Sequence, residues 1–445
     1  MDADRVAFLT DRENQRFSEN HPASRALRER ARVSMPHGYP MSWFHDLNAF
    51  DAPFAVSGEV ARFTDADGLR YLDFNLADMS LFCGFAPPAV AEAVSERAAQ
   101  GWQFLLPTED AIWVAEELGR RYGLPRWQFT LAATTANVEA MRLARVATGR
   151  PIAVMFDGRY HGHADEMLFA PGGGGLVAEL LGLDPGAAHR VRVVPFNDPD
   201  ALEAALALGD VACVITEPAM TNAGVILPSP GFHDDLRRLT RAHGVLLVID
   251  ETHTQVCGPG GLTGRWGLKP DLLTLGKSAA GGVPFGAYGM TEALAAVFER
   301  PDPEDPHAEI AAGGTLFANA MAMAAARAAL GTTLDAAAYA RTAALGTRLA
   351  DGIEAVARDA GLPWRAHRLY PRSGFAHAGV LPANADEARR GFRRDVMDLQ
   401  RVYLANRGIW EAIYSAGPCV GVAHTEVDVD EYLNVLGDFA RELTA

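Results

Sequence analysis

Residues 244–253 read Gly244-Val-Leu-Leu-Val-Ile-Asp250-Glu-Thr-His253, and residues 271–287 read Asp271-Leu-Leu-Thr-Leu-Gly-Lys277-Ser-Ala-Ala-Gly-Gly-Val-Pro-Phe-Gly-Ala287. Each stretch contains a short, continuous hydrophobic run that ends in polar residues. Fully buried parallel strands have this pattern, and ligands bind beyond the carboxyl ends of such strands. We therefore predict two buried strands, one of which presents Asp250 and the other Lys277 to a cleft.

Lysine is scarce in this chain. Lysine and arginine together number 40, yet only Lys269 and Lys277 are lysines. Arginine stays protonated and is a poor nucleophile, whereas a lysine amine can lose its proton and attack a carbonyl. Lys269 precedes Pro270 in a polar turn and is expected to be a solvated charge. Lys277 is the candidate for chemistry, and a second surface charge is the alternative.

A lysine and an acid at neighbouring strand ends suit pyridoxal 5′-phosphate (PLP). The lysine attaches the aldehyde cofactor, and the acid keeps its pyridine nitrogen protonated. In a partly buried site, such an acid–pyridinium pair contributes roughly a few kcal/mol. Two unrelated strand ends are the alternative interpretation of Asp250 and Lys277, because each feature alone is a weak signal.

The bulk composition indicates a large globular protein. The 445 residues are 49% hydrophobic, which predicts two or three structural units with a sizeable core. The net charge of −16 disfavours nucleic acid and anionic membranes as main partners. We expect no signal peptide, no membrane span, no metal site and, with four scattered cysteines, a cytoplasmic location.

Hydrophobic runs alternate with helical spacing along most of the chain, which predicts an α/β fold with a mostly parallel sheet. We expect an N-terminal segment over residues 1–75, a large cofactor-binding domain over 76–330 and a small C-terminal domain over 331–445. The run of glycines at 172–175 is expected to be a loop, and it lacks the pattern of a nucleoside-triphosphate-binding loop.

A predicted strand over residues 129–133 runs into Thr134-Thr135-Ala136-Asn137 and then a helix over 138–148. The N–H groups at a helix N-terminus bind anions, so this turn is a candidate phosphate site. Ordinary capping of the helix by Thr134 or Thr135 is the alternative.

With these residues in view, the chain resembles the class III aminotransferases of PLP fold type I, and within them the glutamate-1-semialdehyde aminomutase branch. The resemblance runs from about residue 30 to about residue 440 and depends on the order and spacing of short motifs. The motifs are Arg142-Leu-Ala-Arg145, Tyr160-His161-Gly162, Glu217-Pro218 with Asn222, Asp250-Glu251, Leu275-Gly276-Lys277, Gly314-Thr315-Leu316 and Ala423-His424-Thr425.

The resemblance implies a role for each of these segments. Lys277 would hold PLP and move a proton between the substrate and the cofactor, and Asp250 would hold the pyridinium nitrogen. Tyr160 would lie on one face of the ring. Asn222 would contact the ring hydroxyl, with Glu217 orienting it from behind.

The phosphate of the cofactor has its own implied ligands. Ala133 and Thr134 would bind it through backbone N–H groups and a hydroxyl. Thr315 would reach the phosphate of a neighbouring subunit, which implies a homodimer with active sites at the interface.

Several residues depart from the family pattern. Ala133 stands where the family has glycine, which requires a negative φ or strain. His253 follows Asp250-Glu251-Thr252, and either a contact with the cofactor or a buried structural hydrogen bond is possible. Ala416 stands before Gly417, where the aminomutases carry an acid. The serine and arginine that hold the carboxylate in the aminomutases are not evident near the N-terminus.

These departures favour an aminotransferase that moves an amino group between an amine or amino acid and a keto acid. Its substrates would be a small-molecule amino donor and a keto acceptor, with apolar or aromatic side chains against Trp43, Phe44, Trp410 and Tyr414. The alternative is that these aromatic residues belong to the core. Arg372 and Arg265 are candidates for binding a carboxylate.

Other functions remain as alternatives on the same scaffold. One is a PLP-dependent racemase or epimerase, in which His253, His161 or Tyr160 would act on the face opposite Lys277. Another is an aminomutase, and a third is a catalytically silent PLP-binding protein. The sequence leaves the substrate and its stereochemistry open.

Overall fold

The structure is a computed structural model that describes residues 3–47, 50–299, 310–411 and 417–445. The chain forms two compact units, each with its own set of contacts. Unit 1 comprises residues 1–87, 340–381 and 390–445, and unit 2 comprises residues 88–339 and 382–389. All the residues from Ala133 to Lys277 that the sequence singles out belong to unit 2.

Unit 2 is built on a seven-stranded sheet with the order β4-β12-β11-β10-β9-β5-β8. Strands β8, β5, β9, β10 and β11 are parallel to one another, and β12 is antiparallel to both of its neighbours. The strands are β4 (Arg126–Thr130), β5 (Ile152–Phe156), β8 (Val191–Val194), β9 (Val211–Thr216), β10 (Leu246–Asp250), β11 (Leu272–Gly276) and β12 (Gly286–Met290). The predicted α/β fold with a mostly parallel sheet is therefore confirmed.

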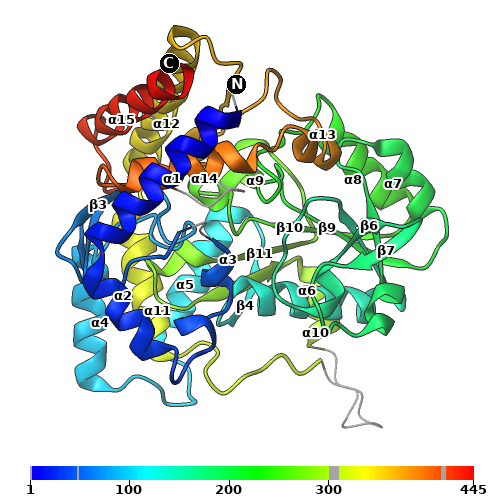
Figure 1. Cartoon of the computed structure of the whole chain (residues 1–445). Helices are drawn as coiled ribbons and strands as arrows, with labels where there is room; N and C mark the ends of the chain where they lie inside the picture. Colours follow the sequence, from blue (N-terminus) through cyan, green and yellow to red (C-terminus); the bar gives the residue numbers. More distant parts are fainter. Residues whose placement is uncertain (1–2, 48–49, 300–309, 412–416) are drawn as a thin grey trace. The chain divides into compact units, whose positions relative to one another are not determined.

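Helices cover both faces of this sheet (Figure 1). On one face, side chains such as Val154 and Ile249 pack against α7 (Pro199–Leu206) and α8 (Phe232–Ala242). On the other face, their neighbours in the strands pack against α6 (Ala133–Thr148) and α10 (Glu292–Phe298). Because successive strand residues point to opposite faces and both faces are covered, the strands are continuously hydrophobic, as the sequence pattern predicts.

Further helices complete unit 2. The helices are α4 (Pro88–Gln100), α5 (Glu109–Tyr122), α9 (Gly261–Arg265), α11 (Ala320–Ala328) and α13 (Ala385–Arg390). Helix α6 begins five residues earlier than the predicted start at residue 138. Within the predicted loop at 172–175, Gly173 and Gly174 form the turn of a hairpin, whereas Gly172 and Gly175 belong to its strands, β6 (Phe169–Gly172) and β7 (Gly175–Ala178).

Unit 1 contains a four-stranded sheet with the order β1-β2-β3-β15. Its strands are β1 (Ala55–Glu59), β2 (Arg62–Asp65), β3 (Arg70–Asp73) and β15 (Ile409–Trp410), and its helices are α1 (Ala3–Asn20), α2 (Pro22–Ala31), α3 (Trp43–Leu47), α12 (Ala336–Asp359), α14 (Arg394–Ala405) and α15 (Glu426–Thr444). A further two-stranded sheet pairs β13 (Arg365–His367) with β14 (Gly374–Ala376).

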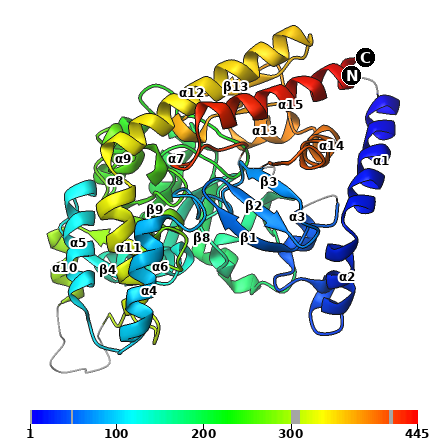
Figure 2. The ribbon, with the colours of Figure 1, turned by 90° about the vertical axis from the view of Figure 1, so that its left-hand side faces the viewer.

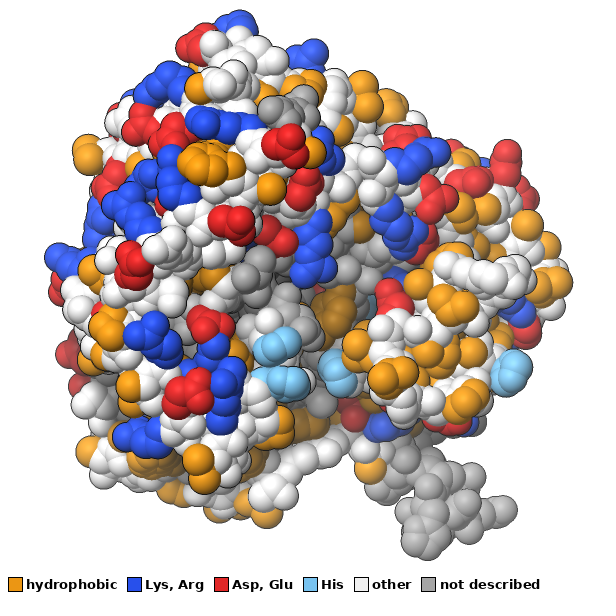
Figure 3. Space-filling model, viewed as in Figure 1, with side chains coloured by type: hydrophobic (Ala, Val, Ile, Leu, Met, Phe, Trp, Pro, Cys, Tyr) orange, Lys and Arg blue, Asp and Glu red, His pale blue; other side chains and the backbone are white. Residues whose placement is uncertain are grey.

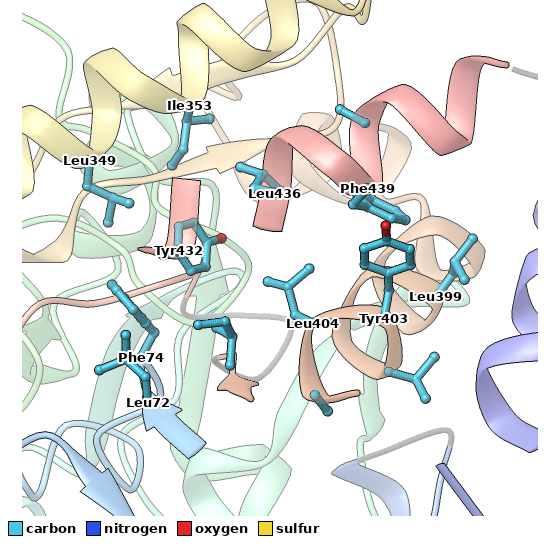
Figure 4. Close-up of a cluster of buried hydrophobic side chains, with 14 of the residues drawn as sticks. Leu72, Phe74, Leu349, Ile353, Leu399, Tyr403, Leu404, Tyr432, Leu436 and Phe439 are labelled. Carbon is cyan, nitrogen blue, oxygen red and sulfur yellow. The ribbon is translucent and has the colours of Figure 1, made fainter. Parts of the chain in front are cut away.

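The core of unit 1 lies where these helices meet the end of β3 (Figure 4). Leu72 and Phe74 from the β3 segment face Leu349 of α12 and Tyr432 of α15, and all four are almost fully buried. Figures 1 and 2 both show α12 and α15 side by side, and Arg348 of α12 binds Asp430 of α15 at 2.8 Å. The first and last helices also meet, because Arg5 donates to the carbonyl of Glu442 at 2.9 Å.

Acidic and basic side chains are interspersed over the face shown in Figure 3. Within the described ranges, no helix has both the length and the hydropathy required to cross a lipid bilayer. In the same ranges, no three His, Cys, Asp or Glu side chains are grouped in a way that suits a metal ion.

Candidate active site

The ends of β10 and β11 bring Asp250 and Lys277 to the same edge of the sheet. Asp250 is paired in register with Thr274, so Lys277 follows three residues beyond its level on the adjacent strand. Lys277 adopts a φ of 48°, in the left-handed region that a non-glycine residue rarely occupies. Such strained backbone conformations occur preferentially at functional sites. The preceding Gly276 lies against α6, since a Cβ at this position would come within 2.9 Å of the backbone nitrogen of Ala133.

The carboxylate of Asp250 is buried and accepts three hydrogen bonds. Nδ2 of Asn137 and Nδ1 of His161 donate to Oδ2 at 2.8 and 2.9 Å. The backbone N–H of Thr252 donates to Oδ1 at 2.9 Å. Oδ1 therefore retains a lone pair for one further donor, because each carboxylate oxygen can accept two hydrogen bonds.

Two opposing effects act on the charge of Asp250. Burial favours the neutral acid, but the hydrogen bonds and charge of His161, together with the hydrogen bonds from Thr252, outweigh burial and lower the pKa of Asp250 below its ordinary value. Asp250 therefore remains an anion in the interior. Nε2 of His161 is buried, and no described protein group lies within hydrogen-bonding distance of it.

Lys277 contacts a histidine from the turn that follows β10. Its Nζ lies 2.6 Å from Nε2 of His253. The sequence left two roles open for His253, a contact with the cofactor or a buried structural hydrogen bond. The structure shows a third, a direct contact with Lys277. Both side chains are partly exposed, whereas Thr252, Thr254 and most of β11 are buried.

The N-terminus of α6 forms another wall of the site. Ala132 occupies the N-cap position and provides no capping side chain. The alternative that Thr134 or Thr135 caps the helix is therefore wrong, and the hydroxyl of Thr135 donates to the carbonyl of Ala132 at 2.8 Å. Ala133 lies in the first helical turn and is not among the residues with positive φ, so it needs no strain.

Thr134 is close to the segment that follows β5. Its hydroxyl accepts a hydrogen bond from the backbone N–H of His163 at 3.3 Å. Gly162 allows this approach, because a Cβ there would lie within 2.6 Å of the Cβ of Thr134. The first turn of α6, with its uncapped N–H groups and a hydroxyl, suits a phosphate.

The structure brings only some of the predicted residues into direct contact with this centre. Tyr160 precedes His161 and is 44% exposed. Glu217 is buried and accepts a hydrogen bond from the backbone N–H of Thr221 at 3.2 Å. The side-chain amide of Asn222 donates to the carbonyl of Arg159 at 3.5 Å, which links the Glu217 segment to the residue before Tyr160.

Other candidates lie elsewhere. Thr315 is exposed, and its carbonyl accepts a hydrogen bond from Gln103. Trp410 packs edge-on against Phe63 and Tyr71 in unit 1, which supports a core role in preference to a substrate pocket.

Two of the remaining candidates, Arg372 and Arg265, bind groups of their own unit. Arg372 is fully buried and donates to Sγ of Cys419 at 2.9 Å, and the exposed Arg265 donates to the carbonyl of Cys257. Tyr414 and Ala416 lie outside the described residues.

Asn137 is a site residue that the sequence analysis did not single out. It donates to Asp250 and also to the carbonyl of His161 at 2.7 Å, and its Oδ1 accepts from the hydroxyl of Thr274 at 2.5 Å. Its position near the start of α6, four residues after Ala133, was the available signal, because one helical turn places two such residues on the same face.

Comparison with known proteins identifies the family to which this site belongs. The family described as "Aminotransferase class-III" matches residues 51–362. The chain belongs to this family. The predicted resemblance is therefore confirmed, and so is the type I fold. The cofactor is pyridoxal 5′-phosphate, as the sequence predicts.

Several relatives match this class III protein over nearly their whole length. A glutamate-1-semialdehyde 2,1-aminomutase from Chloroflexus aggregans is 34% identical, covering 96% of this chain and 99% of the relative. The crystal structure of a glutamate-1-semialdehyde aminomutase from Pseudomonas aeruginosa PAO1 has a TM-score of 0.95 at 39% identity, with coverages of 100% and 99%. A variant of that protein was crystallised in complex with PMP, the pyridoxamine form of the cofactor.

A structural relative with another activity is also similar to this chain. The crystal structure of an omega-transaminase from Sphaerobacter thermophilus has a TM-score of 0.86 at 31% identity, covering 95% of this chain and 98% of that one. The proteins to which this chain is similar thus have names that describe different reactions of the amino group.

The residues present fit this cofactor. Asp250 is an anion with a vacant acceptor position on Oδ1, which suits a protonated ring nitrogen. The uncapped N-terminus of α6 suits the phosphate. Lys277 ends the strand beside Asp250 and offers the primary amine that an aldehyde requires.

Proposed function

We propose that this protein is a PLP-dependent aminomutase that moves an amino group between neighbouring carbon atoms of a small amino aldehyde. The observation that carries the proposal is the sequence identity of 34% and 39% with two aminomutases over almost the entire chain. The name of the relatives, 2,1-aminomutase, places the transferred group on carbon 2 of the substrate and carbon 1 of the product. Glutamate-1-semialdehyde is accordingly the substrate to test first.

We further propose how the residues divide the work. PLP, when bound, withdraws electrons from the carbon atom that carries the amino group and thereby acidifies its C–H bond. Lys277 attaches the cofactor and moves the proton between that carbon and the cofactor. Asp250 keeps the ring nitrogen protonated, because its own pKa is held low by His161 and Thr252.

The remaining site residues orient the cofactor in this proposal. Ala133 and Thr134 hold the phosphate at the start of α6, and Tyr160 covers one face of the ring. Glu217 and Asn222 position the ring hydroxyl from the segment that follows β9. Thr315 serves the phosphate of a second subunit, so that the protein acts as a homodimer. Its cytoplasmic location stays a prediction from the sequence.

An aminotransferase is the second candidate, and one observation specifically favours it. The position before Gly417 is Ala416, whereas the aminomutases that the chain resembles carry an acid there. We preferred this reaction from the sequence alone, but the named relatives support the aminomutase better. An external keto acid is required for repeated turnover by an aminotransferase and is not required by an aminomutase.

The two candidates are separated by one experiment. The purified, cofactor-loaded protein is incubated with an excess of glutamate-1-semialdehyde and with no other amino donor or keto acid. An aminomutase converts many equivalents per site to the isomer that carries the amino group on carbon 1. A yield limited to about one equivalent per site, with turnover restored by an added keto acid, contradicts the aminomutase and supports the aminotransferase.

A pair of variants tests the role of Lys277. Reduction of the loaded protein with borohydride is expected to fix the cofactor on Lys277, as detected by mass spectrometry of its peptide. Lys277→Ala should lose both this adduct and turnover. Lys269→Ala is the matched control, because it removes the only other lysine, and it should retain both. An adduct that persists in Lys277→Ala would assign the attachment to another residue.

A further inference from the structure

The contact between Lys277 and His253 is not explained by the roles proposed above. Nζ and Nε2 are 2.6 Å apart, which is a short hydrogen bond between two basic nitrogen atoms. His253 comes from the turn after β10 and Lys277 from the end of β11, so the contact joins two neighbouring strand ends. Chance proximity of two mobile surface side chains is not the origin, because both segments are fixed by buried hydrogen bonds.

The turn that carries His253 is anchored at each end. The side chain of Glu251 accepts a hydrogen bond from the hydroxyl of Thr254 at 2.6 Å. Its backbone carbonyl accepts one from the backbone N–H of Gln255 at 2.7 Å. The side-chain amide of Gln255 donates to the carbonyl of Gly276 at 2.8 Å. The residue before Lys277 is thereby tied directly to the turn, and the two side chains are held facing one another.

Two protonated nitrogen atoms cannot occupy this geometry. An ammonium group and an imidazolium group have no acceptor between them, and like charges at this separation disfavour the doubly charged state. One proton between Nζ and Nε2 satisfies both atoms. We propose that His253 is a positioning residue for the Lys277 amine and that the two side chains share a single proton.

The shared proton affects how Lys277 acts as the base of the reaction. This consequence rests on the role proposed above for Lys277. When neither side chain carries the shared proton, neutral Lys277 accepts a proton from the substrate carbon and becomes an ammonium group, and this is the single proton that the pair then shares. Transfer of a proton from Nζ to Nε2 breaks one N–H bond and forms another, and the positive charge passes to the imidazole ring. Lys277 is then neutral again. An imidazole titrates near neutral pH, which suits such an exchange.

The two acids that come just before His253 in the chain are engaged elsewhere. Asp250 is bound to His161, which comes from the segment after β5. Glu251 accepts hydrogen bonds from Thr254 and from the backbone N–H groups of residues 262 and 263, on the side of α9. The first turn of α6 contains no acidic residue. Tyr160 and the exposed His163 lie on the same segment as His161.

The scarcity of lysine allows this pair to be observed directly. Full-length protein is produced with ¹³C-labelled lysine, loaded with pyridoxamine 5′-phosphate so that the Lys277 amine is free, and titrated by NMR. Only Lys277 and Lys269 give side-chain signals. The titration spans the ordinary pKa values of histidine and lysine, about 6.5 and about 10.4, and Lys269 provides an internal reference for a solvated amine.

The variant His253→Gln separates hydrogen bonding from proton sharing, because glutamine accepts an N–H group but takes up no proton in this range. In the parent protein, the Lys277 signal should show two inflections, and the lower one should disappear in His253→Gln. His253→Val should also lose it and should shift the upper inflection by about one pH unit or more. His189→Gln, an exposed histidine of the same unit, is the matched control and should behave as the parent does.

Identical Lys277 titration curves in the parent and in His253→Gln would overturn the proposal. If His253→Val does not fold, the comparison between parent and His253→Gln still decides it. The result is independent of turnover. Failure of the borohydride adduct at Lys277 would refute the proposed function, whereas failure of the titration difference would refute only the shared proton.

Discussion

Loss of charge at two adjacent acids, Asp250 and Glu251, should have unequal effects on cofactor binding. Both are buried, but the hydrogen bonds and charge of His161 and the hydrogen bonds from Thr252 outweigh burial and lower the pKa of Asp250, whereas burial dominates and raises the pKa of Glu251. Asp250 has a vacant acceptor position on Oδ1, and Glu251 is surrounded by donors of its own turn, including Thr254. We expect Asp250→Asn to weaken cofactor binding strongly and Glu251→Gln to weaken it little.

The magnitude follows from the loss of one ion pair. Two unit charges about 4 Å apart interact by about 4 kcal/mol at an effective dielectric constant near 20. Each ~1.4 kcal/mol corresponds to a tenfold change in affinity, so the expected loss for Asp250→Asn is about 10²-fold to 10³-fold. The asparagine amide would also meet the donors from Asn137, His161 or Thr252, which adds a structural cost to the folded protein.

The assay is a titration of each apo-protein with PLP, followed by absorbance, together with urea unfolding of the same apo-proteins. Unfolding measures the structural cost, and the remaining loss of affinity reports the charge pair. Glu251→Gln should also carry a structural cost, because its amide would meet the donors from Thr254 or from the backbone of Leu262 or Thr263, but its affinity for PLP should change little. A loss of less than about threefold in affinity for Asp250→Asn, with normal unfolding, would refute the assignment of Asp250 to the pyridinium nitrogen.

Three further outcomes are expected. Burial raises the pKa of Asp73 to about 7, so its contribution to stability is complete below an unfolded pKa near 3.8 and is lost as the pH rises through 7. Asp73→Asn should therefore unfold like the parent at pH ~3 but should be more stable at pH ~8, by up to about 4 kcal/mol. Burial lowers the pKa of His424 to about 4, so its contribution to stability is present above pH ~6.5 and is lost as the pH falls toward 4. Over that interval, the urea midpoint of the parent should decline more than that of His424→Gln. Gly276→Ala should reduce PLP retention on gel filtration because the new Cβ would meet the backbone of Ala133, whereas Gly175→Ala, with open space at its Cβ, should not.

The sequence predicted strands that are buried on both faces, because their hydrophobic runs are unbroken. Strands β10 and β11 agree with the predicted runs within about two residues, which is the usual uncertainty of element boundaries. Strand β12 was missed, because Gly286-Ala-Tyr-Gly289-Met has few β-branched residues. The structure gives the reason for its glycines: a Cβ at Gly289 would lie 2.6 Å from the ring of Trp127 on β4.

The sequence predicted those site residues whose chemistry no other residue type can supply. It did not predict contacts between residues that are far apart in the chain and meet only in the folded protein. Lys277 stands out because only one other lysine exists, and Asp250 because it ends a buried run. Asn137 is an ordinary helix residue in the sequence, and its hydrogen bond to Asp250 joins residues 113 positions apart. The alternative that Thr134 or Thr135 caps α6 failed for a related reason, since Thr135 turns its hydroxyl to the carbonyl of Ala132.

The pair Asp250-Glu251 therefore serves two separate tasks at the end of one strand. Asp250 faces Asn137 and His161 and remains charged, which suits the cofactor. Glu251 instead binds Thr254 and thereby holds the turn that presents His253 to Lys277. Since Gln255 of this turn also binds the carbonyl of Gly276, the orientation of the lysine depends on a carboxylate that need not touch the cofactor. Loss of Glu251 should consequently alter the titration of Lys277 while leaving the affinity for PLP largely intact, a separation that a purely cofactor-binding role for both acids would not produce.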